Sequence, residues 1–124
     1  MVYYLSGEVG CKKNCNKFNS VTRRVYKTAH FRNWHDSAIL QLKSQGIPAV
    51  PVRRFRTEIT LYHGTLRRVD SDNQVTSLLD LLQDARIIKD DCWTCVAEKV
   101  IRDVYRKGEP GALIEIDPLT DSPQ

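Results

Sequence analysis

Apolar residues along the chain follow two spacings, and the wider spacing predicts two helices. Between about residues 30 and 44, apolar side chains recur every three or four positions, which is typical of a helix that packs by one face, and Gly46 is its expected stop. A second stripe fits the i, i+3, i+4, i+7 pattern of an amphipathic helix that ends near Asp84. Its members are Val75, Leu78, Leu79 and Leu82. Ser71 or Asp72 is expected to cap this helix at its amino end.

The narrower spacing, in which apolar and polar residues alternate, predicts strands. It is clearest from Phe55 to Leu61, where one face of a strand would be buried. Shorter apolar runs at Val2–Ser6 and Gly111–Ile116 predict a first and a last strand. From Cys92 to about Val104 we expect a strand at the start, with helical spacing as an open alternative further on. Together these elements predict an α+β fold, in which two main helices pack on a small mixed sheet.

The chain length of 124 residues indicates a single domain that spans residues 1–124. No apolar run approaches the roughly 20 residues needed to span a bilayer. The amino-terminal segment also lacks the basic flank and the long apolar run of a signal peptide. A cytoplasmic protein without a membrane partner is therefore expected.

Charge is distributed unevenly, although the net charge is only +4. Residues 1–68 contain 13 Lys and Arg against three acids, whereas residues 69–124 contain six against 12 acids. The asymmetry predicts a basic surface for a polyanion and a separate acidic centre, with chance clustering on a solvated surface as the alternative. Residues 7–28 are predicted to form a long basic loop, and residues 117–124 a polar tail. The candidate phosphate contacts are Lys12, Lys13, Lys17, Arg23, Arg24, Arg67 and Arg68.

Six aspartates between Asp70 and Asp91 form the candidate acidic centre. Asp70 and Asp72 are two residues apart, so in an extended segment their carboxylates would point to the same side. Asp90 and Asp91 follow the second predicted helix, and we expect the chain to return there and bring this pair beside Asp70. Mg²⁺ prefers oxygen ligands and binds through a few carboxylates together with phosphate oxygens. The pattern fits a metal site, although helix capping and turn formation are the commoner explanation of these residue types alone.

Three segments are more specific together than any one of them is alone. Val69–Asn73 contains Asp-x-Asp-Asn, Leu79–Leu82 places an Asp before an apolar pair, and Ile88–Asp91 ends in Asp-Asp before a predicted strand. Their order and spacing resemble those of the RusA family of Holliday junction resolvases, across about residues 67–96. The fold that this resemblance implies is a small α+β unit, in agreement with the elements predicted above.

The resemblance also implies a function, namely a homodimer whose two metal-dependent sites nick symmetric strands of a four-way DNA junction. It marks Asp70, Asp72 and Asp91 as catalytic residues and metal ligands, with Asp90 as a further ligand and Asp80 as a supporting residue. The implied cofactor is Mg²⁺, for which Mn²⁺ could substitute, and no organic cofactor is expected. A metal bound there would activate a water and stabilise charge on the scissile phosphate. The protein would act on branched DNA in a bacterial cytoplasm, encoded by the bacterium or by a phage.

One position departs from the family pattern. The family usually carries a Lys four residues after the second Asp of the motif, where this chain has Thr76. A neutral hydroxyl cannot replace an ammonium group beside developing negative charge. Another cation, such as Lys89, Lys99 or a basic-loop residue, would then have to take that role. The alternative is a structure-specific DNA-binding protein of the same fold with weak or no cleavage.

Four cysteines occur as two spaced pairs, Cys11 with Cys15 and Cys92 with Cys95, a count that would suit a structural Zn²⁺ ion. Because Cys92 and Cys95 are expected on a strand, their thiols should face opposite sides, and free reduced thiols are the favoured interpretation. The three histidines show no ligand spacing as a set and are expected at a helix surface or a strand end. They are His30, His35 and His63.

Overall fold

A computed structural model of the chain describes residues 1–10, 16–19, 24–27 and 29–120. Within these ranges, six strands and two helices follow one another. Their bounds are β1 Val2–Ser6, β2 Asn16–Asn19, β3 Arg24–Lys27, α1 Ala29–Gln45, β4 Phe55–His63, α2 Ser71–Asp84, β5 Val96–Tyr105 and β6 Gly111–Pro118.

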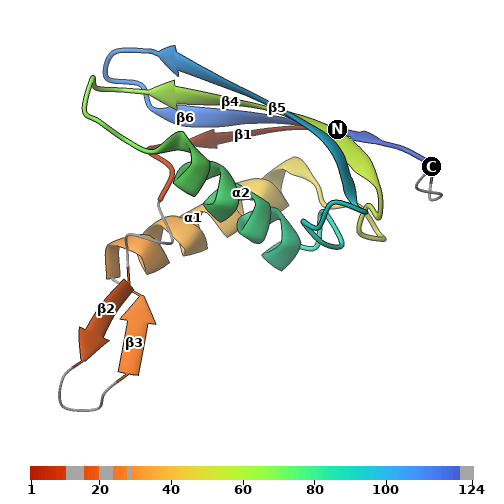
Figure 1. Cartoon of the computed structure of the whole chain (residues 1–124), viewed down its shortest axis with the longest axis horizontal. Helices are drawn as coiled ribbons and strands as arrows, with labels where there is room; N and C mark the ends of the chain where they lie inside the picture. Colours follow the sequence, from red (N-terminus) through yellow and green to blue (C-terminus); the bar gives the residue numbers. More distant parts are fainter. Residues whose placement is uncertain (11–15, 20–23, 28, 121–124) are drawn as a thin grey trace.

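Four of the strands form one mixed sheet in the order β1-β6-β4-β5. Strands β4 and β5 are parallel, whereas β1 and β4 both pair with β6 in the antiparallel direction. Both helices lie on the same face of this sheet (Figure 1). The predicted α+β fold, with two helices on a small mixed sheet, is confirmed.

Helix α2 connects the two parallel strands. A parallel pair requires a crossover, because the chain must return to the starting end before it enters the second strand. The predicted stripe Val75, Leu78, Leu79 and Leu82 is buried along α2, together with Leu81. The loop before α2 and the loop after it consequently lie at opposite ends of the helix (Figure 1).

Helix α1 packs beside α2 through a narrower apolar face. Its buried residues are Phe31, Ala38 and Leu42. His35 adds a polar link, because its Nε2 lies 2.8 Å from Oδ2 of Asp84 on α2. The expected stop at Gly46 is confirmed: this residue follows the helix with a φ of 102°, a conformation that glycine adopts without steric cost.

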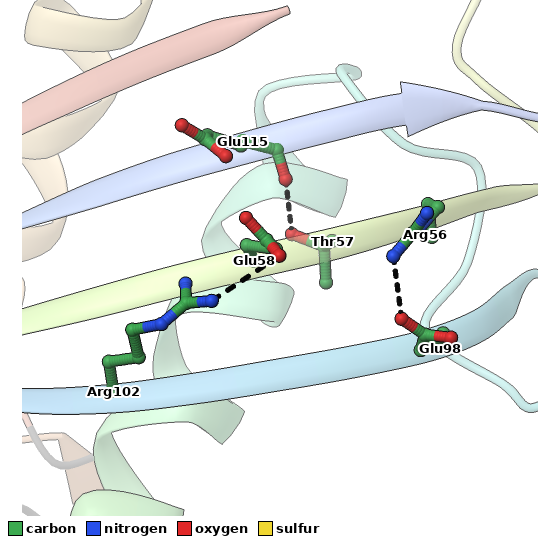
Figure 2. Close-up of polar contacts among 6 residues, drawn as sticks. All are labelled: Arg56, Thr57, Glu58, Glu98, Arg102 and Glu115. Carbon is green, nitrogen blue, oxygen red and sulfur yellow. Dashed lines mark hydrogen bonds and ion pairs between the residues drawn. The ribbon is translucent and has the colours of Figure 1, made fainter.

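Alternation along β4 divides the sheet into a covered and an open face. Phe55, Thr57, Ile59 and Leu61 are buried toward the helices, as the alternating pattern predicted. The residues between them point to the open face, where charged side chains form ion pairs between neighbouring strands (Figure 2). Antiparallel and mixed sheets commonly pack on one face and remain solvated on the other.

The ion pairs of the open face join β4 to β5, the edge strand beside it. Arg56 Nη2 lies 2.8 Å from Glu98 Oε1, and Arg102 Nη2 lies 3.5 Å from Glu58 Oε1 (Figure 2). Glu58 also shares a side-chain hydrogen bond with Glu115 on β6, which lowers the pKa of Glu58 and raises that of Glu115. These contacts add little stability, because they are exposed and solvent screens them.

Two predicted elements differ in the structure. Residues 7–28 are not simply a loop, because β2 and β3 pair as an antiparallel hairpin within them. The segment Cys92–Cys95 is a turn, and the strand begins only at Val96 and continues to Tyr105, so the helical alternative is wrong. The turn is closed by the N–H groups of Cys95 and Val96, which both donate to the carbonyl oxygen of Cys92.

Candidate carboxylate site

The first pair of candidate carboxylates lies at the amino end of α2. Asp70 is the N-cap, with extended backbone (φ −85°, ψ 107°), and its Oδ1 accepts a hydrogen bond of 3.0 Å from the N–H of Asp72. The prediction that Ser71 or Asp72 caps the helix is therefore wrong, because the chain enters the helix one residue earlier. Both carboxylates are exposed, and the positive end of the helix dipole favours negative charge there.

Thr76 follows Asp72 by one helical turn and is exposed on the same side of α2. Its hydroxyl donates a 3.0 Å hydrogen bond to the carbonyl oxygen of Asp72, a common way for a threonine within a helix to satisfy its side chain. Residue 76 therefore supplies no positive charge beside the two carboxylates.

The second pair of candidate carboxylates lies in the loop that follows α2. The carboxylate of Asp90 accepts a 2.7 Å hydrogen bond from the N–H of Asp91, and this bond lowers the pKa of Asp90. Burial raises the pKa of Asp91, and the hydrogen bond to Asp90 and the negative charge of Asp80 raise it further. Asp80, expected only as a supporting residue, therefore lies close enough to Asp91 to influence its ionisation.

The two pairs do not converge within one chain. The first pair lies at the amino end of α2, whereas Asp91 lies near Asp80, which is eight residues or about 12 Å further along the helix than Asp72. In the described part of the chain, no three Asp, Glu, His or Cys side chains come close enough together to hold a metal ion. The expectation that the chain returns to bring Asp90 and Asp91 beside Asp70 is wrong for a single chain, because a crossover between parallel strands leaves its two loops at opposite ends.

The loop before α2 carries two of the predicted phosphate contacts. Arg67 is ion-paired with Glu8, and Arg68 is exposed. Both line a hollow of about 360 Å³ that extends to Ser71, the first residue of α2. This hollow therefore adjoins the helix end that carries Asp70.

The other predicted basic contacts belong to the segment of the hairpin. Lys17 lies on β2 and Arg24 on β3. Lys12, Lys13 and Arg23 fall outside the described residues.

A second basic surface surrounds the loop after α2. Arg53, Arg54 and Lys89 line a hollow of about 280 Å³ together with Asp90 and the cysteine turn. The backbone joins these segments, because Lys89 N–H donates to the carbonyl oxygen of Val52. The signal in the sequence was the Arg-Arg pair before β4, but nothing local showed that it would meet residue 89.

The two thiols of the turn Cys92–Cys95 lie closer together than the sequence predicted. Cys92 Sγ and Cys95 Sγ lie 3.7 Å apart, on the same side of the turn, where opposite sides were expected. A hydrogen bond with Thr94 lowers the pKa of Cys92, whereas burial raises the pKa of Cys95. Cys11 and Cys15 fall outside the described residues.

Two of the histidines form carboxylate pairs within the fold. His35 lies between Asp84 and Asp36, and His63 Nε2 is 2.8 Å from Asp103 Oδ1 on the neighbouring strand. His30 is exposed near the start of α1. Among the described residues, none of the helices combines the length and the apolar character needed to cross a bilayer.

Comparison with known proteins identifies the family to which this chain belongs. The family model described as endodeoxyribonuclease RusA matches residues 10–117, so the chain is a member of the RusA endodeoxyribonuclease family. A curated relative is the crossover junction endodeoxyribonuclease RusA of Aquifex aeolicus (strain VF5). The two chains are 30% identical over 96 residues, which cover 77% of this chain and 75% of the relative.

Proposed function

We propose that this protein is a metal-dependent endodeoxyribonuclease that resolves Holliday junctions by symmetric nicking, and that it acts as a homodimer. The observation that carries the proposal is the placement of two carboxylate pairs at opposite ends of α2 in a chain of the RusA family. Each pair alone is only part of the ligand set proposed for Mg²⁺ or Mn²⁺, which consists of Asp70, Asp72, Asp91 and Asp90 and would be completed by phosphate oxygens and waters.

A two-fold dimer would complete both sites at once. If two copies of α2 pack side by side in opposite directions, Asp70 and Asp72 of one chain meet Asp91 of the other, and the same contact repeats at the other end. The two resulting sites are identical and related by the dimer axis. A four-way junction also has approximate two-fold symmetry, so two such sites would meet equivalent strands.

The carboxylates and the basic residues would have different roles in the reaction. Asp70, Asp72 and Asp91, with Asp90 beside them, would hold the metal, which when bound activates water and stabilises phosphate charge. The exposed carboxylates at the helix amino end would orient a water next to the scissile phosphate. Arg67 and Arg68 would neutralise the DNA backbone as it approaches the hollow beside Ser71. Lys17 on β2 and Arg24 on β3 are proposed as further contacts to the DNA backbone.

A second candidate function is junction binding with weak or no cleavage. It is favoured by Thr76, whose hydroxyl is bonded to the helix backbone, where the family usually carries a lysine. In that case the carboxylates and the basic residues remain, but the transition state lacks a neighbouring cation.

The test is a synthetic four-way junction with one labelled strand, incubated with the protein and Mg²⁺ or Mn²⁺ and separated on a denaturing gel. We expect paired nicks near the branch point, no cleavage of linear duplex of the same sequence, and loss of cleavage with a chelator. Asp70→Asn should abolish nicking while it retains junction binding, because asparagine keeps the helix cap but removes the negative charge. Intact strands despite tight, salt-sensitive binding by the unaltered protein would favour the second candidate.

A further inference from the structure

The turn Cys92–Cys95 places two thiols side by side at the surface. The carbonyl oxygen of Cys92 accepts hydrogen bonds of 3.0 Å from Cys95 N–H and 2.9 Å from Val96 N–H, so the backbone of the turn is closed. The two Sγ atoms lie 3.7 Å apart. The turn adjoins Asp90, which hydrogen-bonds to Cys92, but the proposed nuclease reaction uses neither thiol.

A disulfide can form here with little rearrangement. The S–S bond is about 2.05 Å long, so the sulfur atoms must approach by about 1.7 Å, which side-chain rotation can supply without a change of backbone path. Two cysteines this close therefore already have the spacing from which ring closure is easy. By contrast, cysteines on the strand that the sequence predicted could not have met.

The two thiols differ in access to solvent. Cys92 is exposed, whereas Cys95 is half-buried against the start of β5. An external disulfide can therefore reach Cys92 first, and Cys95 is placed to attack the mixed disulfide that results. Arg53, Arg54 and Lys89 line the same hollow and would attract an anionic disulfide such as that of glutathione.

We propose that Cys92 and Cys95 form a redox-active dithiol that exchanges with low-molecular-weight disulfides. The Cys92 thiolate attacks one sulfur of glutathione disulfide, which forms a mixed disulfide and releases one glutathione thiolate. The Cys95 thiolate then attacks Cys92 Sγ, forms the intramolecular disulfide and releases the second glutathione. The protein loses two electrons and two thiol protons, and one glutathione disulfide becomes two glutathione thiols.

The experiment uses the full chain with Cys11→Ser and Cys15→Ser, so that only the two thiols of the turn remain. The protein is equilibrated in glutathione buffers of increasing oxidation, with a chelator present, then quenched with a thiol-alkylating reagent and weighed intact by mass spectrometry. We expect both thiols to become unavailable for alkylation together, and the protein to carry no attached glutathione. The transition should follow a two-electron titration curve, and a reductant should reverse it. The fluorescence of Trp93, measured with Trp34→Phe to remove the second tryptophan, should fall in parallel as the disulfide forms beside it.

Single variants separate the two roles. Cys95→Ser should accumulate the mixed disulfide on Cys92, because the resolving thiol is absent. Cys92→Ser should react more slowly, because Cys95 is less accessible. Two alkylated thiols that persist in excess glutathione disulfide would overturn the proposal, and so would stable glutathione adducts on the protein that retains both cysteines.

Discussion

The two ends of α2 carry the same kind of side chain in opposite surroundings. At the amino end, Asp70 caps the helix and Asp72 lies in its first turn, so main-chain N–H groups and the helix dipole stabilise negative charge. At the other end, burial, Asp90 and Asp80 all raise the pKa of Asp91. The first pair is therefore stable without a ligand, whereas Asp91 favours a proton or a cation. We infer that a bound metal would stabilise negative charge more strongly at Asp91 than at Asp70 and Asp72.

The largest effects are expected from substitution of the carboxylates at the two ends of α2, tested separately and then in mixed dimers. Asp70→Asn and Asp91→Asn should each lower junction nicking by more than about 100-fold, beyond the usual loss for residues that only support metal ligands. If each site takes Asp70 from one chain and Asp91 from its partner, a mixed dimer has one doubly altered site and one intact site. If the two variants are mixed equally and exchange subunits, half of the dimers are mixed and about a quarter of all sites should be intact. Nicking on a denaturing gel, followed against the mixing ratio, measures this.

The matched control mixes Asp70→Asn with Asp72→Asn. Both substitutions lie at the same end of α2, so every mixed dimer retains one altered residue in each site and no activity should return. Failure of the Asp70 and Asp91 variants to complement each other, in dimers shown to exchange subunits, would contradict a shared site.

A smaller gain is expected from restoring positive charge at the amino end. Thr76→Lys should raise the rate of nicking by roughly 10- to 100-fold, because it places an ammonium group one turn after Asp72. Thr76→Ala, which removes the hydroxyl without adding charge, should leave the rate nearly unchanged. An equal rate for Thr76→Lys and the unaltered protein would show that another cation already performs this role.

The smallest effect concerns stability and its dependence on pH. Because the folded-state pKa of Asp91 is raised, the stability that this group contributes is fully present below its unfolded pKa and is lost as the pH rises through the folded pKa. Asp91→Asn should therefore raise the melting temperature at neutral pH, by no more than about 4 °C, and the difference should vanish in acid. Thermal unfolding between acid and neutral pH measures the shift.

Asp70→Asn serves as the comparison for this prediction, because asparagine caps a helix about as well as aspartate and should change the melting temperature little. Mg²⁺ should stabilise the unaltered protein and do less for either variant. A lower melting temperature for Asp91→Asn at neutral pH would show that the carboxylate is needed structurally.

Local spacing predicted both helices and the strands of the main sheet, but neither their ends nor the hairpin of β2 and β3. The stripe from Val75 to Leu82 predicted α2, because a helical repeat depends on neighbours three and four residues apart. The cap at Asp70 was missed by one residue, since both Asp70 and Ser71 are good caps and only the backbone path distinguishes them. The turn at Cys92 was missed because it contains neither glycine nor proline and is closed by hydrogen bonds to one carbonyl oxygen.

The arrangement of the candidate site required information that local spacing does not contain. The residues were identified from a compound motif, and their roles remain predictions. Their separation follows from the parallel pairing of β4 with β5, because a helix between parallel strands leaves the loops at its two ends far apart. The proximity of Asp80 to Asp91, and of Arg54 to Lys89, likewise depends on packing between segments distant in sequence.

The position of β6 has a consequence for how the protein is made. Of the four strands of the mixed sheet, β6 is the last to leave the ribosome, yet it lies in the interior of the sheet, where it pairs with β1 on one side and β4 on the other. Until β6 emerges, β1 has no strand partner and can pack only against α1, while β4, α2 and β5 begin to associate without it. A nascent chain that stalls before Gly111 would therefore expose the inner edges of both β1 and β4, and such unpaired edges invite association with other chains.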